Sequence, residues 1–252
     1  MLLNYLEQSY QLGPLTIHVY GLALAVAITA GLYVAIHNAS QKNIKPDQIW
    51  ELSIYSIIGA LIGARFFSVA MHPDRFLADP LYLFRIHEGG LAFYGGLIGG
   101  ALFAFLYLRR KKLSFWTAGD IYAPSLALGE AITRLGCDVY GVASNTAPWP
   151  RIINGVAYHN IPLYMFVASL LLFTFLWFLR GKLQQGQLFL VYLAGYFAIR
   201  TFVDFFRSEA VYSIFNQAQL AGLGLFCAAL ITIYVRNKSL AGTGNKSKNF
   251  GT

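Results

Sequence analysis

The chain has 252 residues, of which 57% are hydrophobic and 12% charged, and its formal net charge is +8. Soluble domains average roughly 45–50% apolar and about 25% charged residues. This composition excludes an ordinary soluble enzyme and predicts a membrane protein with several spans. The two cysteines, Cys137 and Cys227, form neither a metal-ligand pattern nor a disulfide framework. We expect no metal or other cofactor and no nucleic-acid partner.

Apolar runs of about 20 residues, the length that crosses a hydrocarbon core, recur along the chain. They cover residues 17–37, 48–70, 89–108, 115–133, 161–179, 187–206 and 217–235. The pattern predicts one all-α membrane domain of seven spans over residues 1–240, with an extracytoplasmic loop at 133–160 and a disordered cytoplasmic tail at 241–252. Asp120, Pro124 and Glu130 interrupt the fourth run, so charge must decide whether it spans.

The basic residues divide by side. With seven spans, one side collects most of the 19 basic residues, namely Lys42, Lys45, Arg109, Arg110, Lys111, Lys112, Arg180, Lys182, Arg236, Lys238, Lys246 and Lys248. The positive-inside rule makes this side cytoplasmic. We therefore predict an amino terminus outside and a carboxyl terminus in the cytoplasm. All the basic clusters agree, which supports the fourth span.

The basic residues of the other side are all arginines, namely Arg65, Arg75, Arg85, Arg134, Arg151, Arg200 and Arg207. Topology needs only positive charge, whereas planar bidentate recognition of phosphate or carboxylate prefers arginine. The outer face is therefore predicted to hold an anion. Snorkelling or salt-bridged arginines are the alternative. That alternative suits Arg75 and Arg85 better than Arg134 and Arg200, because charges in membrane spans are usually functional.

A glycine-rich stretch from Ile86 to Gly100 runs from a polar His87-Glu88 pair into an apolar segment. Each glycine costs a helix interior roughly 1 kcal/mol relative to alanine, so another backbone or a ligand head group is expected to come close. Membrane helices pack tightly through small residues spaced three and four apart. A glycine-lined packing face without chemistry is therefore the alternative to a head-group site that includes Tyr94.

The sixth apolar run contains a polar stripe. Tyr192, Tyr196, Arg200, Asp204 and Arg207 recur at intervals of four, four, four and three, so they share one face of a helix. In a membrane, such a face turns toward a protein interior or a wet cavity. Asp204 is expected to pair with both arginines. The alternative is an ion-pair stripe that only sets the register of the helix.

The segment from Thr133 to Asn160 is long for a connection between spans. Ordered loops of this length are commonly functional. The segment contains His159, which is either a functional group or an ordinary exposed loop histidine.

Several motifs taken together resemble the prolipoprotein diacylglyceryl transferases. They are Glu88-Gly-Gly-Leu-Ala-Phe-Tyr-Gly-Gly-Leu-Ile-Gly99, Arg134-Leu-Gly136, Gly186-Gln-Leu-Phe189 with the stripe that follows it, His18-Val-Tyr-Gly21 and Gly63-Ala-Arg-Phe66. The resemblance covers nearly the whole chain in order. It implies a seven-span protein of the bacterial plasma membrane with a site open to the outer leaflet. It also implies transfer of diacylglycerol from phosphatidylglycerol to the lipobox cysteine of a prolipoprotein, with release of glycerol phosphate.

The resemblance also implies roles for single residues. Tyr94, Arg134 and Arg200 are the implied catalytic residues. The implied substrate-binding residues are Tyr20, Gly95, Gly96, Tyr196, Asp204, Arg207 and His159. The arginines would stabilise the departing phosphate through preorganised charge. Tyr94 would bind the head group or relay the thiol proton, with His87 or His159 as alternative bases.

The chain departs from the family pattern mainly in the outer loop, where an acceptor would dock. Cys137 stands where the family usually has asparagine, and a family glutamate is replaced near Val142. The segment His159-Asn-Ile-Pro-Leu-Tyr164 reduces a His-Pro-Thr-Gln-Leu-Tyr motif, and Asp204 replaces a glutamate. Two alternatives therefore stay open: a related transferase with a different acceptor, and a phospholipid-binding or transport protein without chemistry.

Overall fold

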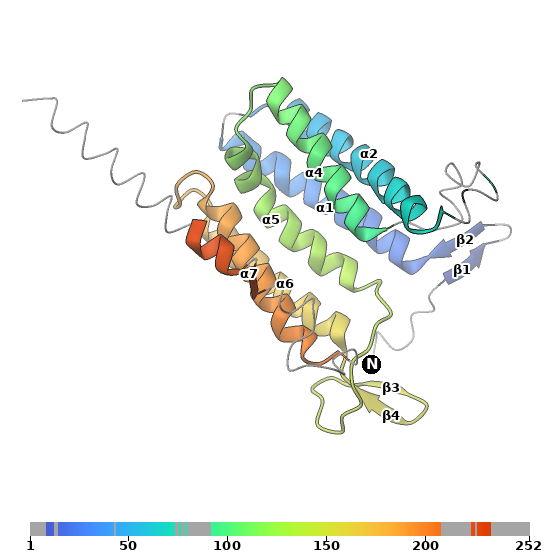
Figure 1. The fold of residues 1–252 in the computed structure, drawn as a ribbon. Helices are drawn as coiled ribbons and strands as arrows, with labels where there is room; N and C mark the ends of the chain where they lie inside the picture. The colour runs from blue at the N-terminus through green and yellow to red at the C-terminus, as the bar shows by residue number, and fades with distance from the viewer. Residues whose placement is uncertain are drawn as a thin grey trace, which may run out of the picture. The chain divides into compact units, whose positions relative to one another are not determined.

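The structure is a computed structural model that describes residues 9–12, 15–42, 44–73, 76, 79, 92–207, 223–224 and 226–232. The described chain is mostly helical and adds two short antiparallel hairpins (Figure 1). Its internal contacts define two units, residues 1–35 with 119–252 and residues 36–118. Each unit is described by itself.

The unit of residues 36–118 contains two long helices that pack against each other. Helix α2 spans Pro46–Met71 and helix α4 spans Phe93–Arg110. A polar clip joins them: Glu51 accepts from the Lys111 ammonium at 2.8 Å and from the Tyr107 hydroxyl at 2.9 Å. The clip lies at the end of α4 that carries the predicted cytoplasmic cluster.

Glycines bring the backbones of α2 and α4 into contact. A Cβ atom added to Gly59 would lie 2.6 Å from the Gly99 carbonyl oxygen, and one added to Gly99 would lie 2.9 Å from the Cα of Gly63. Real Cβ atoms do not approach other atoms so closely, so only glycine fits at these positions. Small residues serve membrane helices in this way. The glycine-rich stretch is therefore, at least over these positions, a helix-packing face.

The other unit contains most of α1 (Val19–Ser40) and of α5 (Phe115–Arg134), together with α6 (Ile161–Leu179) and α7 (Gln187–Asp204). A hairpin of β1 (Ser9–Leu12) and β2 (Leu15–His18) precedes α1, with Ser9 opposite His18. A second hairpin of β3 (Arg151–Ile153) and β4 (Val156–Tyr158) precedes α6, with Arg151 opposite Tyr158.

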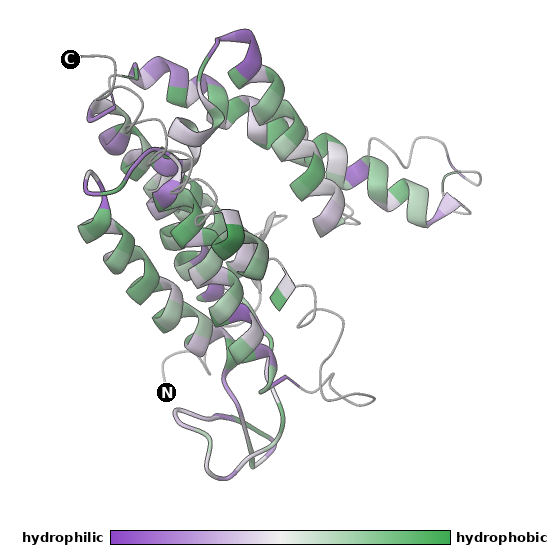
Figure 2. Cartoon of the chain, turned by 60° about the vertical axis from the view of Figure 1, so that its left-hand side comes forward, coloured by the Kyte–Doolittle hydropathy of each residue, from purple (hydrophilic) through white to green (hydrophobic). Residues whose placement is uncertain are grey.

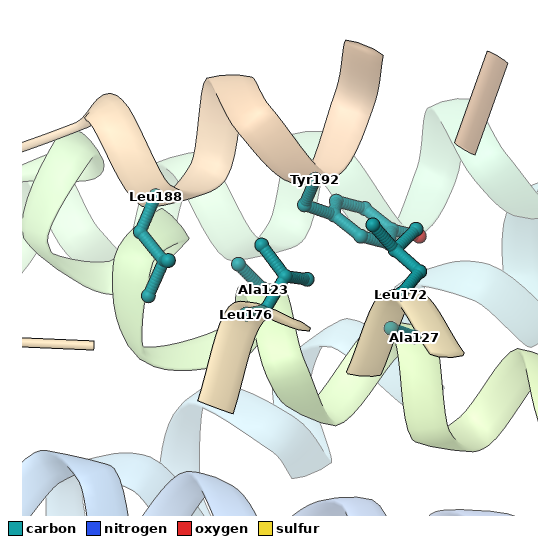
Figure 3. Packing of buried hydrophobic residues seen from close by; sticks show 6 residues of the cluster. All are labelled: Ala123, Ala127, Leu172, Leu176, Leu188 and Tyr192. Carbon is teal, nitrogen blue, oxygen red and sulfur yellow. The ribbon is translucent and has the colours of Figure 1, made fainter. Parts of the chain in front are cut away.

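The core of this unit lies where α5, α6 and α7 meet (Figure 3). It contains Ala123, Ala127, Leu172, Leu176, Leu188 and Tyr192. Small alanines on α5 face larger leucines on α6 and α7, which fills the space between the helices as dense interiors require. Tyr192 is also the first residue of the polar stripe. The stripe of α7 therefore begins inside the protein and not on a lipid-facing surface.

The start of α7 is capped from another helix. Its N-cap residue, Gly186, has a φ of 86° and no side chain that could cap the helix. The buried Asp120 carboxylate of α5 instead accepts from the Gly186 N–H at 2.6 Å and from the Phe189 N–H at 3.0 Å. These N–H groups lack partners within their own helix. The carboxylate that interrupts the fourth predicted span thus holds α7 in register against α5.

Six of the seven predicted spans coincide with helices to within a few residues. Of the last, 217–235, residues 223–224 and 226–232 are described and are helical, and the tail at 241–252 lies outside the described residues. Among the described residues, three helices, α1, α2 and α6, are long and apolar enough to cross a membrane. Figure 2 shows that hydrophobic residues lie mainly along the helices. The all-α prediction was incomplete, because hairpins form beside the starts of α1 and α6.

Candidate functional site

Three arginines pair with two carboxylates at the ends of α5 and α7. Asp204, whose side chain is only 2% exposed, forms ion pairs with Arg200 Nε at 3.2 Å and with Arg207 Nη1 at 3.5 Å. Neither contact has the geometry of a hydrogen bond. The predicted pairing of Asp204 with both arginines is confirmed, and the carboxylate orients the two guanidinium groups from a buried position.

Arg134, the last residue of α5, pairs with Glu130 one helical turn earlier. Its Nε donates to Glu130 Oε1 at 2.9 Å, and its Nη2 donates to the same oxygen. Residues four apart lie on one face of a helix, so the spacing alone signals this pair. The pair was not among the sequence-based predictions, in which Glu130 was only an interruption of the fourth span.

Tyr196 lies near both sets of ion pairs. Its hydroxyl interacts electrostatically with charged groups on both α5 and α7. We call this group the arginine cluster; it comprises Glu130, Arg134, Tyr196, Arg200, Asp204 and Arg207. Three guanidinium groups face two carboxylates, so the cluster carries a net charge of +1 at neutral pH. Its arginine side chains are 21–24% exposed.

The arginine cluster retains hydrogen-bond donors for an anion. Arg200 directs Nε toward Asp204, and Arg207 directs one terminal nitrogen toward the same carboxylate. Within the described part of the chain, the terminal nitrogens of Arg200 make no hydrogen bond. A guanidinium group with free terminal N–H groups can bind phosphate oxygens in a bidentate manner. The geometry thus suits an anion with one or two negative charges.

The segment after α5 folds back onto the end of α7. The Val142 N–H donates to the Phe206 carbonyl at 3.0 Å, and the Gly141 N–H donates to the His159 carbonyl at 2.8 Å. The ring of His159 packs on Phe206 with centroids 4.8 Å apart. His159 and Val142 therefore lie beside the carboxyl-terminal end of α7. Both contact Phe206, the residue that precedes Arg207 in the chain.

His159 is held by a hydrogen-bond chain. Its Nδ1 lies 3.1 Å from the Tyr164 hydroxyl, which in turn donates to the Pro148 carbonyl at 2.7 Å. Because the hydroxyl proton serves Pro148, the Nδ1 atom carries the proton in the contact with Tyr164. The side chain is half-buried and not exposed, and a functional role for His159 stays a prediction.

Tyr20 and Cys137 both lie beside the turn that follows Arg134. The side chain of Tyr20 is 50% exposed, and its backbone packs on Gly136, where an added Cβ would lie 2.9 Å from the Tyr20 Cα. The Cys137 thiol donates to the Thr133 carbonyl at 3.5 Å. Burial raises the pKa of this thiol despite the nearby Arg134 guanidinium. Since the thiolate is the nucleophile, the raised pKa argues against covalent catalysis by Cys137.

Tyr94, Gly95 and Gly96 lie on α4 in the unit of residues 36–118. The Tyr94 side chain is 67% exposed. The space beside Gly95 is filled by Gly63 and Phe67 of α2, whereas an added Cβ at Gly96 would make only ordinary contacts at 3.5 Å. The roles of these three residues in catalysis and binding stay predictions.

His87, an alternative base, lies outside the described residues. Within the described ranges, no three His, Cys, Asp or Glu side chains gather into a group that could hold a metal ion.

Comparisons with known proteins show what the chain resembles. A family model described as "Prolipoprotein diacylglyceryl transferase" matches residues 8–235. The phosphatidylglycerol–prolipoprotein diacylglyceryl transferase of Nostoc sp. is 32% identical over 266 aligned residues, which cover 96% of this chain and 94% of that protein. The protein of the same name from Enterococcus faecalis is 30% identical and covers 92% and 90%. The chain belongs to the prolipoprotein diacylglyceryl transferase family.

Proposed function

We propose that the chain transfers the diacylglyceryl group of phosphatidylglycerol to the lipobox cysteine thiol of prolipoproteins and releases glycerol phosphate. Family membership supports the reaction class, and the names of the relatives support both substrates. The observation that carries the proposal for this chain is the arginine cluster, with three guanidinium groups around two carboxylates.

The reaction breaks the carbon–oxygen bond between the glycerol backbone and the phosphate. The phosphate gains negative charge as this bond breaks, and a sulfur nucleophile attacks the carbon from the opposite side. Arg134, Arg200 and Arg207 supply preorganised positive charge for the leaving phosphate. Electrostatic stabilisation of this kind is usually the largest single contribution to lowering a transition state. Asp204 and Glu130 hold the guanidinium groups in place, so little reorganisation is needed when charge develops.

Tyr94 and His159 are further residues with proposed roles. Tyr94 would bind the head group or relay a proton, and Tyr20, Tyr196 and Gly96 would contact the lipid. His159 lies beside the end of α7 and presents an Nε2 lone pair when its Nδ1 is protonated. The assignments of Tyr20, Tyr196 and His159 rest on family motifs and on the positions of these residues in the unit that contains the arginine cluster. Those of Tyr94 and Gly96, which lie in the other unit, rest on family motifs alone.

We further propose a bacterial plasma-membrane protein of seven spans that forms one membrane domain. Its amino terminus lies outside, and its carboxyl-terminal tail at 241–252 lies in the cytoplasm. The apolar helices α1, α2 and α6 support membrane integration. The basic clusters at the end of α4 and between α6 and α7 support the orientation through the positive-inside rule. In this orientation, residues 133–160 and the arginine cluster belong to the outer side.

An assay with two readouts tests the function. The purified protein is reconstituted with phosphatidylglycerol and given a lipobox peptide, while glycerol phosphate release and peptide mass are followed together. We expect lipidated peptide and glycerol phosphate in equal amounts. Arg134→Ala and Arg200→Ala should each abolish both products and leave the protein folded in membranes. Lys111→Ala, which breaks the clip with Glu51, is the matched control and should retain activity.

The other outcomes identify the alternatives. Normal turnover by Arg134→Ala or Arg200→Ala would overturn the role of the arginine cluster. Glycerol phosphate without a modified peptide would indicate another acceptor. The altered positions Cys137 and Val142 favour this second candidate, because both lie in the outer segment, and Val142 binds the end of α7. Neither product from the unchanged protein, together with lipid binding that survives Tyr94→Phe, would indicate a protein without chemistry.

A further inference from the structure

Glu130 is the acidic residue of α5 in the arginine cluster, and its two carboxylate oxygens differ. Both contacts with Arg134, from Nε and from Nη2, end on Oε1. Within the described part of the chain, Oε2 accepts no hydrogen bond. The side chain is 20% exposed, so Oε2 is open to a small group that enters the site.

The other described groups of the site are less suited to accept a proton. Asp204 is nearly fully buried and directs both oxygens to arginines. Tyr196 carries a phenol, whose ordinary pKa near 10 makes a weak base at neutral pH. The described contacts of the His159 ring are with Tyr164 and Phe206 and not with a side chain of the arginine cluster. Glu130 thus combines a free oxygen with direct contact to a phosphate-binding arginine.

The groups that face Glu130 come from two helices and one loop. Arg134 lies on α5 and Cys137 in the segment that follows α5. Tyr192 and Tyr196 lie on α7. At neutral pH the only charge among these four is that of Arg134. The Glu130 carboxylate therefore lies beside one positive charge, that of Arg134, and the guanidinium group donates to Oε1 and not to Oε2.

We propose that Glu130 is a further catalytic residue, whose Oε2 accepts the proton of the acceptor thiol. The inference rests on the proposed function. In this step the S–H bond breaks and the proton moves to Oε2 of Glu130. The sulfur forms a bond to the glycerol carbon, and the electron pair of the broken C–O bond leaves with the phosphate. Arg134 binds the carboxylate and the leaving phosphate side by side, which aligns the proton acceptor with the reacting carbon.

The pH dependence of Glu130→Gln tests the proposal. Glutamine keeps the size of the side chain and an oxygen that can accept from Arg134, but it replaces the basic oxygen with an amide. At pH 7 we expect kcat/KM for the lipobox peptide to fall by about 100-fold, within the range of general-base effects. Above the ordinary thiol pKa of about 8.5 the acceptor ionises without help. The deficit should therefore shrink severalfold between pH 7 and pH 9.5.

An acceptor with a more acidic nucleophile gives an independent measurement. A lipobox peptide with selenocysteine in place of cysteine is already ionised at pH 7. If Glu130 accepts the proton, Glu130→Gln and the unchanged protein should modify this peptide at rates within a few-fold of each other. The matched control is Glu51→Gln, which changes another ion-paired helix glutamate and should leave the pH profile unchanged with both peptides.

Two results would overturn the inference without affecting the proposed function. One is an unchanged rate in Glu130→Gln at every pH. The other is a deficit that stays constant with pH and persists with the selenocysteine peptide, which would mean that Glu130 only holds Arg134. If the unchanged protein fails to lipidate either peptide, the proposed function itself fails, and this inference fails with it.

Discussion

Asp204 has a buried carboxylate whose ion pairs orient two arginines. Its side chain is 2% exposed, and Arg200 and Arg207 approach different oxygens of the carboxylate. A buried charge is costly unless it is paired, so the three residues depend on one another. Since the two guanidinium groups repel each other, Asp204 also keeps them close enough to bind one phosphate.

Removal of Asp204 should therefore affect both stability and activity. Asp204→Ala leaves two part-buried guanidinium groups without their partner, and we expect a loss of about 3 kcal/mol of unfolding free energy. We also expect kcat to fall at least tenfold, because the arginines lose their orientation. Thermal unfolding in detergent and the peptide assay measure the two effects.

The matched control for Asp204 is Asp138→Ala. It breaks the more exposed ion pair with Arg151 in the outer segment, and exposed pairs contribute roughly 0–1 kcal/mol. An equal loss of stability in the two variants would contradict the argument that burial makes the Asp204 pairs important.

At the scale of elements, two groups of helices are held together in different ways. Glycines let α2 and α4 approach until their backbones touch, whereas α5, α6 and α7 meet through alanine and leucine side chains. Asp120 adds a polar tie from α5 to the start of α7. The packing of α2 and α4 depends on glycines that have no side chain, and the packing of α5, α6 and α7 depends on how well their side chains fit together. The α2–α4 pair should therefore respond most sharply to an added methyl group.

Gly99→Ala tests the packing of α2 and α4. The added methyl would lie 2.9 Å from the Cα of Gly63, so the backbones must separate. Overpacking of this kind costs roughly 1–3 kcal/mol and should exceed the gain of about 1 kcal/mol in helix propensity. We expect a lower midpoint in denaturant titrations followed by circular dichroism.

Gly96→Ala is the control on the same helix. Its added methyl would make only ordinary contacts at 3.5 Å, so helix propensity should dominate and the midpoint should not fall. If Gly99→Ala proved as stable as Gly96→Ala, the close approach of the two backbones would be disproved.

At the scale of the whole molecule, orientation in the membrane decides which substrates reach the arginine cluster. In the proposed orientation, the β3–β4 turn at Asn154 lies outside and the α6–α7 connection at Lys182 lies in the cytoplasm. Both residues are exposed. Each position can therefore report the side on which it lies without disturbing the packing of the helices.

Single cysteines placed at these two positions test the orientation. In a background without the native cysteines, Asn154→Cys should react with a membrane-impermeant maleimide in intact cells, provided that the reagent can pass the cell wall or outer membrane and reach the outer face of the plasma membrane. Lys182→Cys should react only after the plasma membrane is opened. The reverse pattern would show that the protein is inserted the other way, with residues 133–160 facing the cytoplasm.

The sequence by itself determined the features that depend on local spacing and on composition. Apolar runs located the helices to within a few residues, because burial in lipid demands a minimum apolar length. The pairing of Asp204 with its two arginines also followed from the sequence, since residues three and four apart meet on any helix. The same rule signals the pair of Glu130 and Arg134.

Only the tertiary structure decided features that depend on which elements meet. The bond from Asp120 to the Gly186 N–H joins residues 66 positions apart, and no local pattern encodes that meeting. The structure also showed that Gly95 contacts α2 and that His159 packs on Phe206. A side chain's chemistry can be read from its type, but its surroundings arise when distant parts of the chain pack together.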